Sequence, residues 1–579
     1  MTYNKLNALI RKRSLDLQEK RRSILEFPAE QVVEKILDSE KPVELVHSFP
    51  EEDLYLLINE IGHQDALPVI SLASAKQWEY ITDMNIWEGD TVDPVAATKW
   101  FSLLMAADAD RFSRWCADNK QALTELFLYR NVDIGIREDD EDATDFGPEF
   151  FTIDDTFYFR VRELPVETDP DDALEAREAL EHFKQQRQKL FPELLGKIAT
   201  NDYQLYRNLL MEAATIIPAE TEEELYRLRN VRLAEKGFLP REEAVGVYQP
   251  LDPQDLPQRS AKYASPASAD TPLPPVPLAS DSLLETDTLF GSALAAIDRV
   301  ELKMQLQAEF AALCNNLIIA DHKKVSNRQG LEEIVKKACD FISIGLANLP
   351  EDHRRMIQTF PLADIFRVGY GKALALKWKA EAWQKESWYT RAGLRLNFWG
   401  ETFMGVIGGL LIQKPLFFDN YATGTIYREF QTAADIRSTE YLLDQIISLD
   451  RLFGLQGVEE AQEQTNPPLT FCNLLLTGWA AYCSGLSPIP PYATHIPLKA
   501  FKAFYKTLWN NQDPAAIKTE VKTSFAEWVV STSGLSIDDV SSQYGDIFTD
   551  LFKEIEAEYA KVVVDDLDPR FILLFRVEA

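Results

Sequence analysis

The sequence predicts a mainly α-helical protein. We expect an N-terminal solenoid of short helices with a small β-hairpin insertion, a proline-rich linker, and an α-helical C-terminal domain with minor β-structure. Helix-start signals recur about every dozen residues near the N-terminus, with apolar residues at spacings of three and four. The stretch at residues 131–163 is rich in aromatic and β-branched residues, which is typical of strands. A chain of 579 residues is too long for one hydrophobic core, so two or three domains are expected.

The segment HSFPEEDLYLLINEIGHQDALPVISLA, residues 47–73, illustrates the N-terminal pattern. Ser48-Phe-Pro-Glu51 fits a capping box, in which the Ser48 hydroxyl accepts from a free backbone N–H and Glu51 reaches back to Ser48. Four apolar residues follow at helical spacing, and Gly62 ends this helix. A new helix begins at once, with Pro68 in its first turn.

Neighbouring segments repeat this pattern. Helix starts are expected at Pro28, Pro42, Ser74 and Asp93. Helices this short are unstable alone, so they must stack and bury a shared core, as in a helical solenoid. An irregular all-α domain with similar caps is the alternative. Residues 1–130 are therefore predicted to form a helical-repeat domain.

Residues 131–163 change character. NVDIGIRE alternates apolar and polar residues, and FTIDDTFYFRVRE is rich in aromatic residues, so two strands around an acidic loop are predicted. The loop at 138–147 lacks the glycine and the twelfth-position glutamate of a calcium-binding loop, which leaves a solvated acidic loop as the interpretation.

The remaining chain divides by composition. Residues 164–247 are predicted to be a helical extension, 248–282 a linker rich in Pro, Ser and Ala, and 283–579 a mainly helical C-terminal domain. Within that domain, residues 414–430 are expected to form a hairpin or a long loop. The uncharged run at 464–498 is interrupted by polar residues and prolines, so we interpret it as a buried helix and expect no transmembrane segment.

Charge and termini restrict the function classes. The chain has 92 acidic and 60 basic side chains, a net charge of -32, which repels phosphate backbones and argues against general nucleic-acid binding. Five widely spaced cysteines and an N-terminus without an apolar signal core predict a cytoplasmic protein. The basic N-terminal helix either docks on the acidic body or makes weak peripheral membrane contact.

No catalytic residue, metal site or cofactor is predicted. The six histidines show no metal-ligand spacing, and the chain contains neither His-Glu-x-x-His nor Gly-x-Ser-x-Gly.

One stretch, residues 366–399, is basic and aromatic within this acidic chain. Guanidinium groups bind anions through paired hydrogen bonds, and tryptophan faces stack on planar ligands or cations. The candidate ligand-binding residues are Arg367, Lys372, Trp378, Trp383, Arg391 and Arg395. The alternative is an amphipathic helix with tryptophan in the core and lysine in water.

Two resemblances add to this interpretation. PAEQVVEKIL, FPEEDLYLLINEI and SAKQWEYITDM, within about residues 25–90, are similar to the N-terminal helical-repeat domain of bacterial magnesium transporters. The nucleotide-sensing and membrane parts of those transporters have no counterpart, so magnesium sensing is not implied. FPEEDLYLLINEIG, DEDATDFGPEFFTIDDTFYFRV and LRNVRLAEKGFLPREEAVGVYQPL resemble a deltaproteobacterial family known as domain of unknown function 6178. That resemblance spans most of the chain and implies a cytoplasmic bacterial protein without naming an activity.

Together these features favour a non-enzymatic helical scaffold or adaptor that binds a protein partner. The alternative is an enzyme or a sensor of a small ligand, an anion or a nucleotide, with its pocket in the C-terminal domain.

Overall fold

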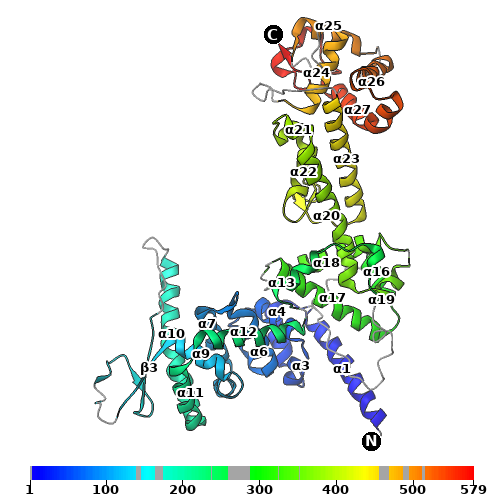
Figure 1. The fold of residues 1–579 in the computed structure, drawn as a ribbon. Coiled ribbons are helices and arrows are strands. Elements are labelled where there is room, and N and C mark those ends of the chain that lie inside the picture. The colour runs from blue at the N-terminus through cyan, green and yellow to red at the C-terminus, as the bar shows by residue number, and fades with distance from the viewer. Residues whose placement is uncertain are drawn as a thin grey trace. The chain divides into compact units, whose positions relative to one another are not determined.

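The computed structural model is mainly α-helical with few, short strands, as the sequence predicted (Figure 1). It describes residues 3–25, 27–138, 142, 145–163, 174–236, 238–258, 287–321, 323, 325, 327–350, 352–455, 469–486, 495–510 and 515–578. The chain packs as two compact units. Unit 1 comprises Met1–Gln249, Leu256–Ile342 and Pro350–Phe366, and unit 2 comprises Pro250–Asp255, Ser343–Leu349 and Arg367–Ala579. The finer five-part division stays a prediction.

Unit 1 opens with consecutive short helices. They are α1 (Tyr3–Leu25), α2 (Ala29–Leu37), α3 (Pro42–Ser48), α4 (Glu51–Ile61), α5 (Leu67–Leu72), α6 (Ala75–Asn85), α7 (Pro94–Ala107), α8 (Ala109–Arg114) and α9 (Gln121–Asn131), with a π-turn at Trp115–Asn119 before α9. From α2 to α7, helices pack against the helix after next: α2 on α4, α3 on α5, α4 on α6, and α5 on α7. Each of these helices buries at least two apolar residues against its neighbours, which stabilises helices too short to be stable alone.

Most of the predicted helix starts are confirmed. Pro28 precedes α2, Pro42 begins α3, and the Asp93 side chain caps α7 by accepting from the Val95 N–H. Ser74 forms a complete capping box with Gln77 at the start of α6. These caps satisfy backbone N–H groups that have no partner within a helix.

The capping box predicted at Ser48 is wrong. Ser48 is the last residue of α3, and its hydroxyl donates to the Leu45 carbonyl oxygen at 2.6 Å. Helix α4 begins after Pro50, which makes no side-chain cap. The short gap between α3 and α4 leaves Ser48 inside the preceding helix, so its hydroxyl bonds backwards rather than forwards.

Helix α1 is held against α3 by its basic side chains. Arg13 forms a two-bond pair with Glu44, at 2.9 and 2.8 Å, and the buried Arg21 donates to the Ser48 carbonyl oxygen. The docked-helix interpretation therefore accounts for these two basic residues.

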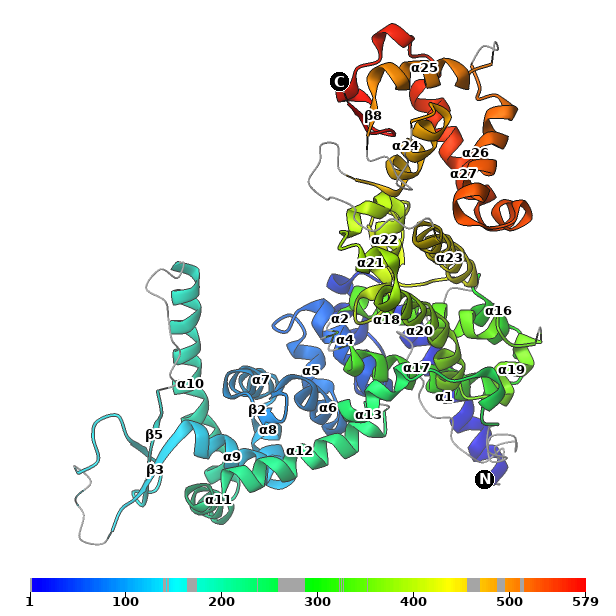
Figure 2. The same cartoon turned by 45° about the horizontal axis from the view of Figure 1, so that its top comes forward.

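A small antiparallel sheet follows α9. Strands β3 (Val132–Ile136) and β5 (Phe157–Val161) are the two that the sequence predicted, and β4 (Phe151–Thr152) adds a short third strand in the order β3-β5-β4. The sheet lies beside α10 (Leu174–Asn201) and close to α11 (Tyr203–Thr215) (Figure 2). Much of the predicted acidic loop, residues 139–141 and 143–144, lies outside the described residues.

The rest of unit 1 is mainly helical. It contains a two-strand ribbon, β1 (Trp87–Glu88) with β2 (Thr91–Val92), and helices α12 (Pro218–Ala234), α13 (Arg241–Ala244), α16 (Leu289–Ala295), α17 (Val300–Ala320), α18 (Arg328–Leu346, which continues into unit 2) and α19 (His353–Thr359). Arg232 on α12 pairs with Asp83 on α6 through two hydrogen bonds of 2.8 and 2.9 Å. The predicted linker lies mostly outside the described residues, from 259 onwards.

Unit 2 is built around long helices. They are α20 (Leu362–Glu386, whose first turn belongs to unit 1), α21 (Trp388–Arg391), α22 (Gly400–Leu411), α23 (Ala433–Leu455), α24 (Phe471–Cys483), α25 (Leu498–Leu508), α26 (Thr519–Ser533) and α27 (Ile537–Tyr559). Short strands pair as β6 (Phe417–Phe418) with β7 (Tyr427–Arg428), and as β8 (Ile496–Pro497) with β9 (Val577–Glu578).

Helix α24, which lies within the uncharged run at 464–498, packs in the interior of unit 2. Trp479 is fully buried and its ring meets those of Phe504 and Phe525, each with centroids 5.0 Å apart. The predicted buried helix is confirmed for Phe471–Cys483, while residues 464–468 and 487–494 lie outside the described part of the chain. Within that described part, every helix is too short or too polar to cross a lipid bilayer.

Candidate functional site

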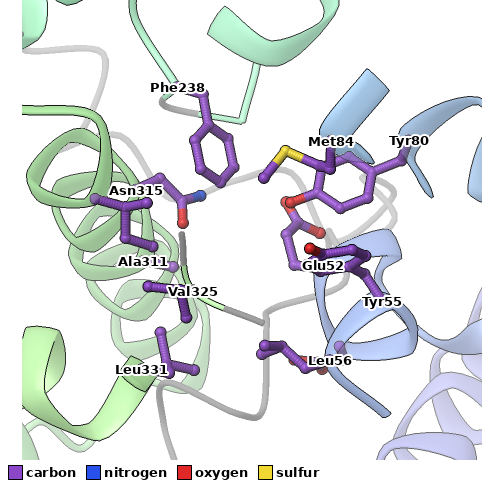
Figure 3. Close-up of a pocket in the computed structure, with 12 residues that line it drawn as sticks. Glu52, Tyr55, Leu56, Tyr80, Met84, Phe238, Ala311, Asn315, Val325 and Leu331 are labelled. Atoms are coloured by element: carbon purple, nitrogen blue, oxygen red, sulfur yellow. The ribbon is translucent and has the colours of Figure 1, made fainter. Parts of the chain in front are cut away.

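A small cavity in unit 1 is the best-formed candidate site (Figure 3). Helices α4 and α6 supply Glu52, Tyr55 and Tyr80, while α17 supplies Asn315, and Phe238 closes the cavity from the segment after α12. Its volume is about 40 Å³. A water molecule needs roughly 10–15 Å³ measured in this way, and pockets for drug-sized ligands run from roughly 300 Å³ upwards. The cavity therefore has room for a few water molecules or one small ion.

The acidic side of the cavity comes from the first turn of α4. Glu51 and Glu52 lie at a helix N-terminus, where the backbone favours negative charge. The Lys236 ammonium lies 2.7 Å from Glu51 Oε2 and 3.1 Å from Glu52 Oε1. Burial raises the pKa of Glu52, and Lys236 opposes that rise. Burial alone would lower the pKa of Lys236, but its two glutamate neighbours outweigh this and raise it.

The Tyr80 hydroxyl points into the cavity beside Glu52 (Figure 3). Tyr80 is 5% exposed, and its hydroxyl has no hydrogen-bond partner among the described residues. Burial and the charge of Glu52 raise the pKa of Tyr80 well above its usual range, so the phenol keeps its proton. The hydroxyl can therefore bond a water molecule or a ligand atom in the cavity.

The opposite wall is fixed by Asn315. Its side-chain amide donates to the Lys236 carbonyl oxygen at 2.7 Å, so α17 is tied to the segment that also carries Phe238. The Tyr80 ring lies edge-on to Tyr55 with centroids 6.0 Å apart, and 6.4 Å from Phe238. The cavity thus offers a carboxylate acceptor and a phenol donor within aromatic walls. Among the described residues, no group of three His, Cys, Asp or Glu side chains is placed to hold a metal ion.

Sequence reasoning missed this cavity. Its one local signal is the Glu51-Glu52-Asp53 start of α4, which also fits an ordinary acidic helix start. Lys236 and Asn315 lie far along the chain, and only the tertiary packing brings them to α4.

The residues predicted to bind a ligand are spread along one helix and its end. Arg367, Lys372, Trp378 and Trp383 all lie on α20. At about 1.5 Å per residue, Arg367 and Trp383 are about 24 Å apart along the axis. At about 100° per residue, Arg367 and Trp378 share one face while Lys372 and Trp383 share a roughly opposite one. The structure therefore does not bring these four side chains together.

The last two candidates follow α20. Arg391 is exposed at the end of α21 and donates to the Glu386 carbonyl oxygen at 2.6 Å, and Arg395 is exposed in the turn that follows. The role of all six residues in ligand binding stays a prediction.

Tryptophans of this stretch form an aromatic cluster in unit 2. Trp383 stacks on Tyr389, with centroids 6.1 Å apart, and meets Trp399 edge-on at 5.8 Å. The buried Asp450 carboxylate on α23 accepts from the backbone N–H groups of Trp388 and Tyr389, at 3.1 and 2.8 Å. Burial raises the pKa of Asp450, and the two backbone donors oppose that rise. Trp383 thus belongs to the core, as the amphipathic-helix alternative expects.

The fold defines the chain as a mainly α-helical protein of two compact units. Residues 10–578 match the model of the family described as Family of unknown function (DUF6178), so the chain belongs to that family, as its sequence resemblance indicated. No curated protein and no solved structure matches the chain significantly. The resemblance of residues 25–90 to the magnesium-transporter domain stays a prediction.

Proposed function

We propose that the chain is a cytoplasmic helical scaffold or adaptor that binds a protein partner. The observation that carries this proposal is the packing of α2 to α7, in which each short helix meets the helix after next. Regular contacts between near neighbours are typical of a solenoid, and solenoids present extended surfaces to partners. The net charge of -32 indicates that the partner surface is basic.

Affinity purification of the tagged chain at low salt, followed by native mass spectrometry, tests this proposal. We expect a complex with a fixed ratio of the chain to one protein partner, and we expect it to weaken as salt is added because salt screens exposed charges. Recovery of the chain alone, at low salt and after mild lysis, would overturn the scaffold proposal.

A small-ligand sensor is the second candidate, and the unpartnered Tyr80 hydroxyl is the observation that favours it. The cavity volume of about 40 Å³ limits a ligand there to a few heavy atoms. Potassium, ammonium and acetate are therefore the probes for a thermal-shift measurement, because a bound ligand raises the melting temperature by mass action.

The matched control is Tyr80→Phe, which removes the hydroxyl and keeps the ring. A melting shift present in the wild type and lost in Tyr80→Phe would support a ligand at this cavity. Equal shifts in both proteins, or none, would count against it. ATP and phosphate, compared in the wild type and in Arg391→Gln, test the anion site predicted at residues 366–399 in the same experiment.

A further inference from the structure

One face of the small sheet in unit 1 is entirely apolar. Residues directly opposite one another on paired strands share a face. The register pairs Ile136 with Phe157, and it pairs both Ile134 and Phe151 with Phe159. Because side chains alternate along a strand, this apolar face includes the whole series Val132, Ile134, Ile136, Phe151, Phe157, Phe159 and Val161.

The middle of this face is covered and its rim is open. Phe157 and Phe159 on the central strand are 1% and 0% exposed, and the Phe157 ring meets Tyr206 of α11 edge-on at 6.2 Å. Phe151 on the edge strand β4 is 47% exposed, and Ile153 just beyond it is 42% exposed. Side chains of this size are normally buried when a sheet face is complete, so the rim is the part of the face that the described residues leave uncovered.

The outer edge of β4 is also open. In the order β3-β5-β4, strand β4 has β5 on one side only. Apart from this pairing, no backbone hydrogen bond joins residues 151–153 to any other described residue. Soluble proteins protect edge strands by keeping them very short, by placing lysine or proline on them, or by covering them, since free N–H and C=O groups accept a further strand. Strand β4 is short, with two residues, but it has no such side chain. The edge at 151–153 carries Phe, Thr and Ile instead.

The segment that carries this edge is strongly acidic in sequence. Residues 131–163 contain eleven acidic and three basic side chains. The three arginines are engaged within the sheet: Arg137 pairs with Asp155 at 2.7 Å, and Arg160 and Arg162 both pair with Asp133, at 2.9 and 2.6 Å. With three basic against eleven acidic side chains, this segment carries a net charge of -8, which attracts a basic partner segment.

We propose that the β4 edge is a docking site for an extended segment of a partner protein that alternates apolar and basic side chains. The backbone of that segment pairs with β4 as a fourth strand, which gives affinity. Its apolar side chains cover Phe151 and Ile153, and its lysine or arginine side chains face the acidic residues around the sheet. This inference rests on the proposed scaffold function and names the site and the kind of partner.

Three synthetic nine-residue peptides, each with a fluorescent label, test the proposal on the full chain. One alternates lysine and valine, one alternates lysine and proline, and one alternates glutamate and valine. The first two carry equal charge, but proline has no backbone N–H and cannot pair in a ladder. We expect the lysine–valine peptide to bind at least tenfold more tightly than the other two, measured by fluorescence anisotropy.

Two variants of the edge and one control complete the test. Phe151→Ser and Ile153→Asn each remove one exposed apolar side chain. We expect each variant to bind the lysine–valine peptide at least fivefold more weakly than the wild type does. The control is Val43→Asn, since Val43 on α3 is also 47% exposed but lies outside the sheet. Circular dichroism checks that all three fold, and hydrogen exchange on the peptide complex must show protection of amides at 150–154.

Equal binding of the lysine–valine and lysine–proline peptides would overturn the proposal, because charge alone would explain it. Binding that is absent, or that is unchanged in both edge variants, would overturn it too. If native mass spectrometry still shows a stoichiometric partner, the scaffold proposal stands and the β4 site falls. If neither experiment shows binding, both proposals fall.

Discussion

Trp378 and Trp383 lie five residues apart on α20 and have opposite environments. Trp378 is 49% exposed, whereas Trp383 is 8% exposed and packs on Tyr389 and Trp399. We expect Trp383→Ala to lower the free energy of unfolding by roughly 3–5 kcal/mol, the usual range for a buried aromatic residue. Trp378→Ala should change it by about 0.5 kcal/mol or less, as is usual at the surface. Urea unfolding of both variants measures the difference, and equal losses would contradict the packing described.

The ion pairs of Arg428 make a contribution to stability that depends on pH, and a substitution of Arg428 can measure this contribution. It binds Asp419 at 2.8 Å and Asp435 at 2.8 and 3.1 Å, and all three side chains are largely buried. The pKa of Asp419 is lowered by the Thr423 backbone N–H and then by Arg428. Burial would raise the pKa of Asp435, but Arg428 and backbone donors outweigh it and the pKa is lowered.

A carboxylate with a lowered pKa stabilises the fold above its unfolded pKa, about 3.9 for aspartate, and this contribution is lost as pH falls through the folded value. Arg428→Met should therefore be clearly less stable than wild type at pH 7. This gap in stability between the two proteins should narrow below about pH 4. Denaturant midpoints at pH 7, 5 and 3 measure the gap. The control is Arg227→Met, which breaks an exposed pair with Glu224 and should show little gap at any pH. A gap that does not change with pH would contradict this account.

The role of some single residues could be predicted from the sequence, and the role of others could not. The start at Ser74 was predictable because a capping box is local, and the structure confirms it. Ser48 carried the same signal and was misassigned, because the helix before it extends to its own position. The cavity at Glu52 was not predictable, since its partners Lys236 and Asn315 lie far along the chain.

At the scale of elements, the β6–β7 hairpin packs on a glycine face of α22. A side chain on Gly405 would overlap the Phe418 ring, and a Cβ on Gly409 would lie 2.6 Å from the Leu416 carbonyl oxygen. Glycine weakens a helix interior, so its presence here reflects the close approach of the hairpin. The β6–β7 hairpin is therefore the element that packs against these glycines.

Gly409→Ala should therefore destabilise unit 2, by roughly 1–3 kcal/mol as for other overpacked sites. Gly545→Ala on α27 is the matched control, because no atom lies within 4 Å of its added Cβ. That change should raise stability by about 0.5–1 kcal/mol through helix propensity. Thermal unfolding of both variants tests the prediction, which fails if Gly409→Ala is neutral or stabilising.

Elements with a strong local pattern were predictable, and those defined by pairing were not. The alternation in Val132–Ile136 and the aromatic run in Phe157–Val161 predicted β3 and β5, which the structure confirms. Strand β4 has two residues, too few for any periodicity to appear, and it exists only because β5 offers an edge to pair with. Helix α24 was predictable because an uncharged run bounded by prolines and broken by polar residues favours a buried helix.

At the scale of the whole molecule, the mainly α class could be predicted from helix signals that recur along the chain. The division into two units could not be predicted from those signals. Residues 250–255 and 343–349 belong to unit 2, although the chain on both sides of them belongs to unit 1. The assignment of these two segments to unit 2 depends on contacts between residues far apart in sequence, and no local pattern predicts such contacts. The pair between Arg232 and Asp83 is another long-range contact of this kind within unit 1.

The central claim is that the chain binds a protein partner through the surface of its N-terminal half. The most direct measurement is hydrogen–deuterium exchange on the purified complex compared with the free chain. We predict slower exchange at residues 150–154 and on exposed faces of the helices between 29 and 131, with the amides of α24 unchanged because they are already buried. Protection confined to unit 2, with residues 29–163 unchanged, would contradict the claim.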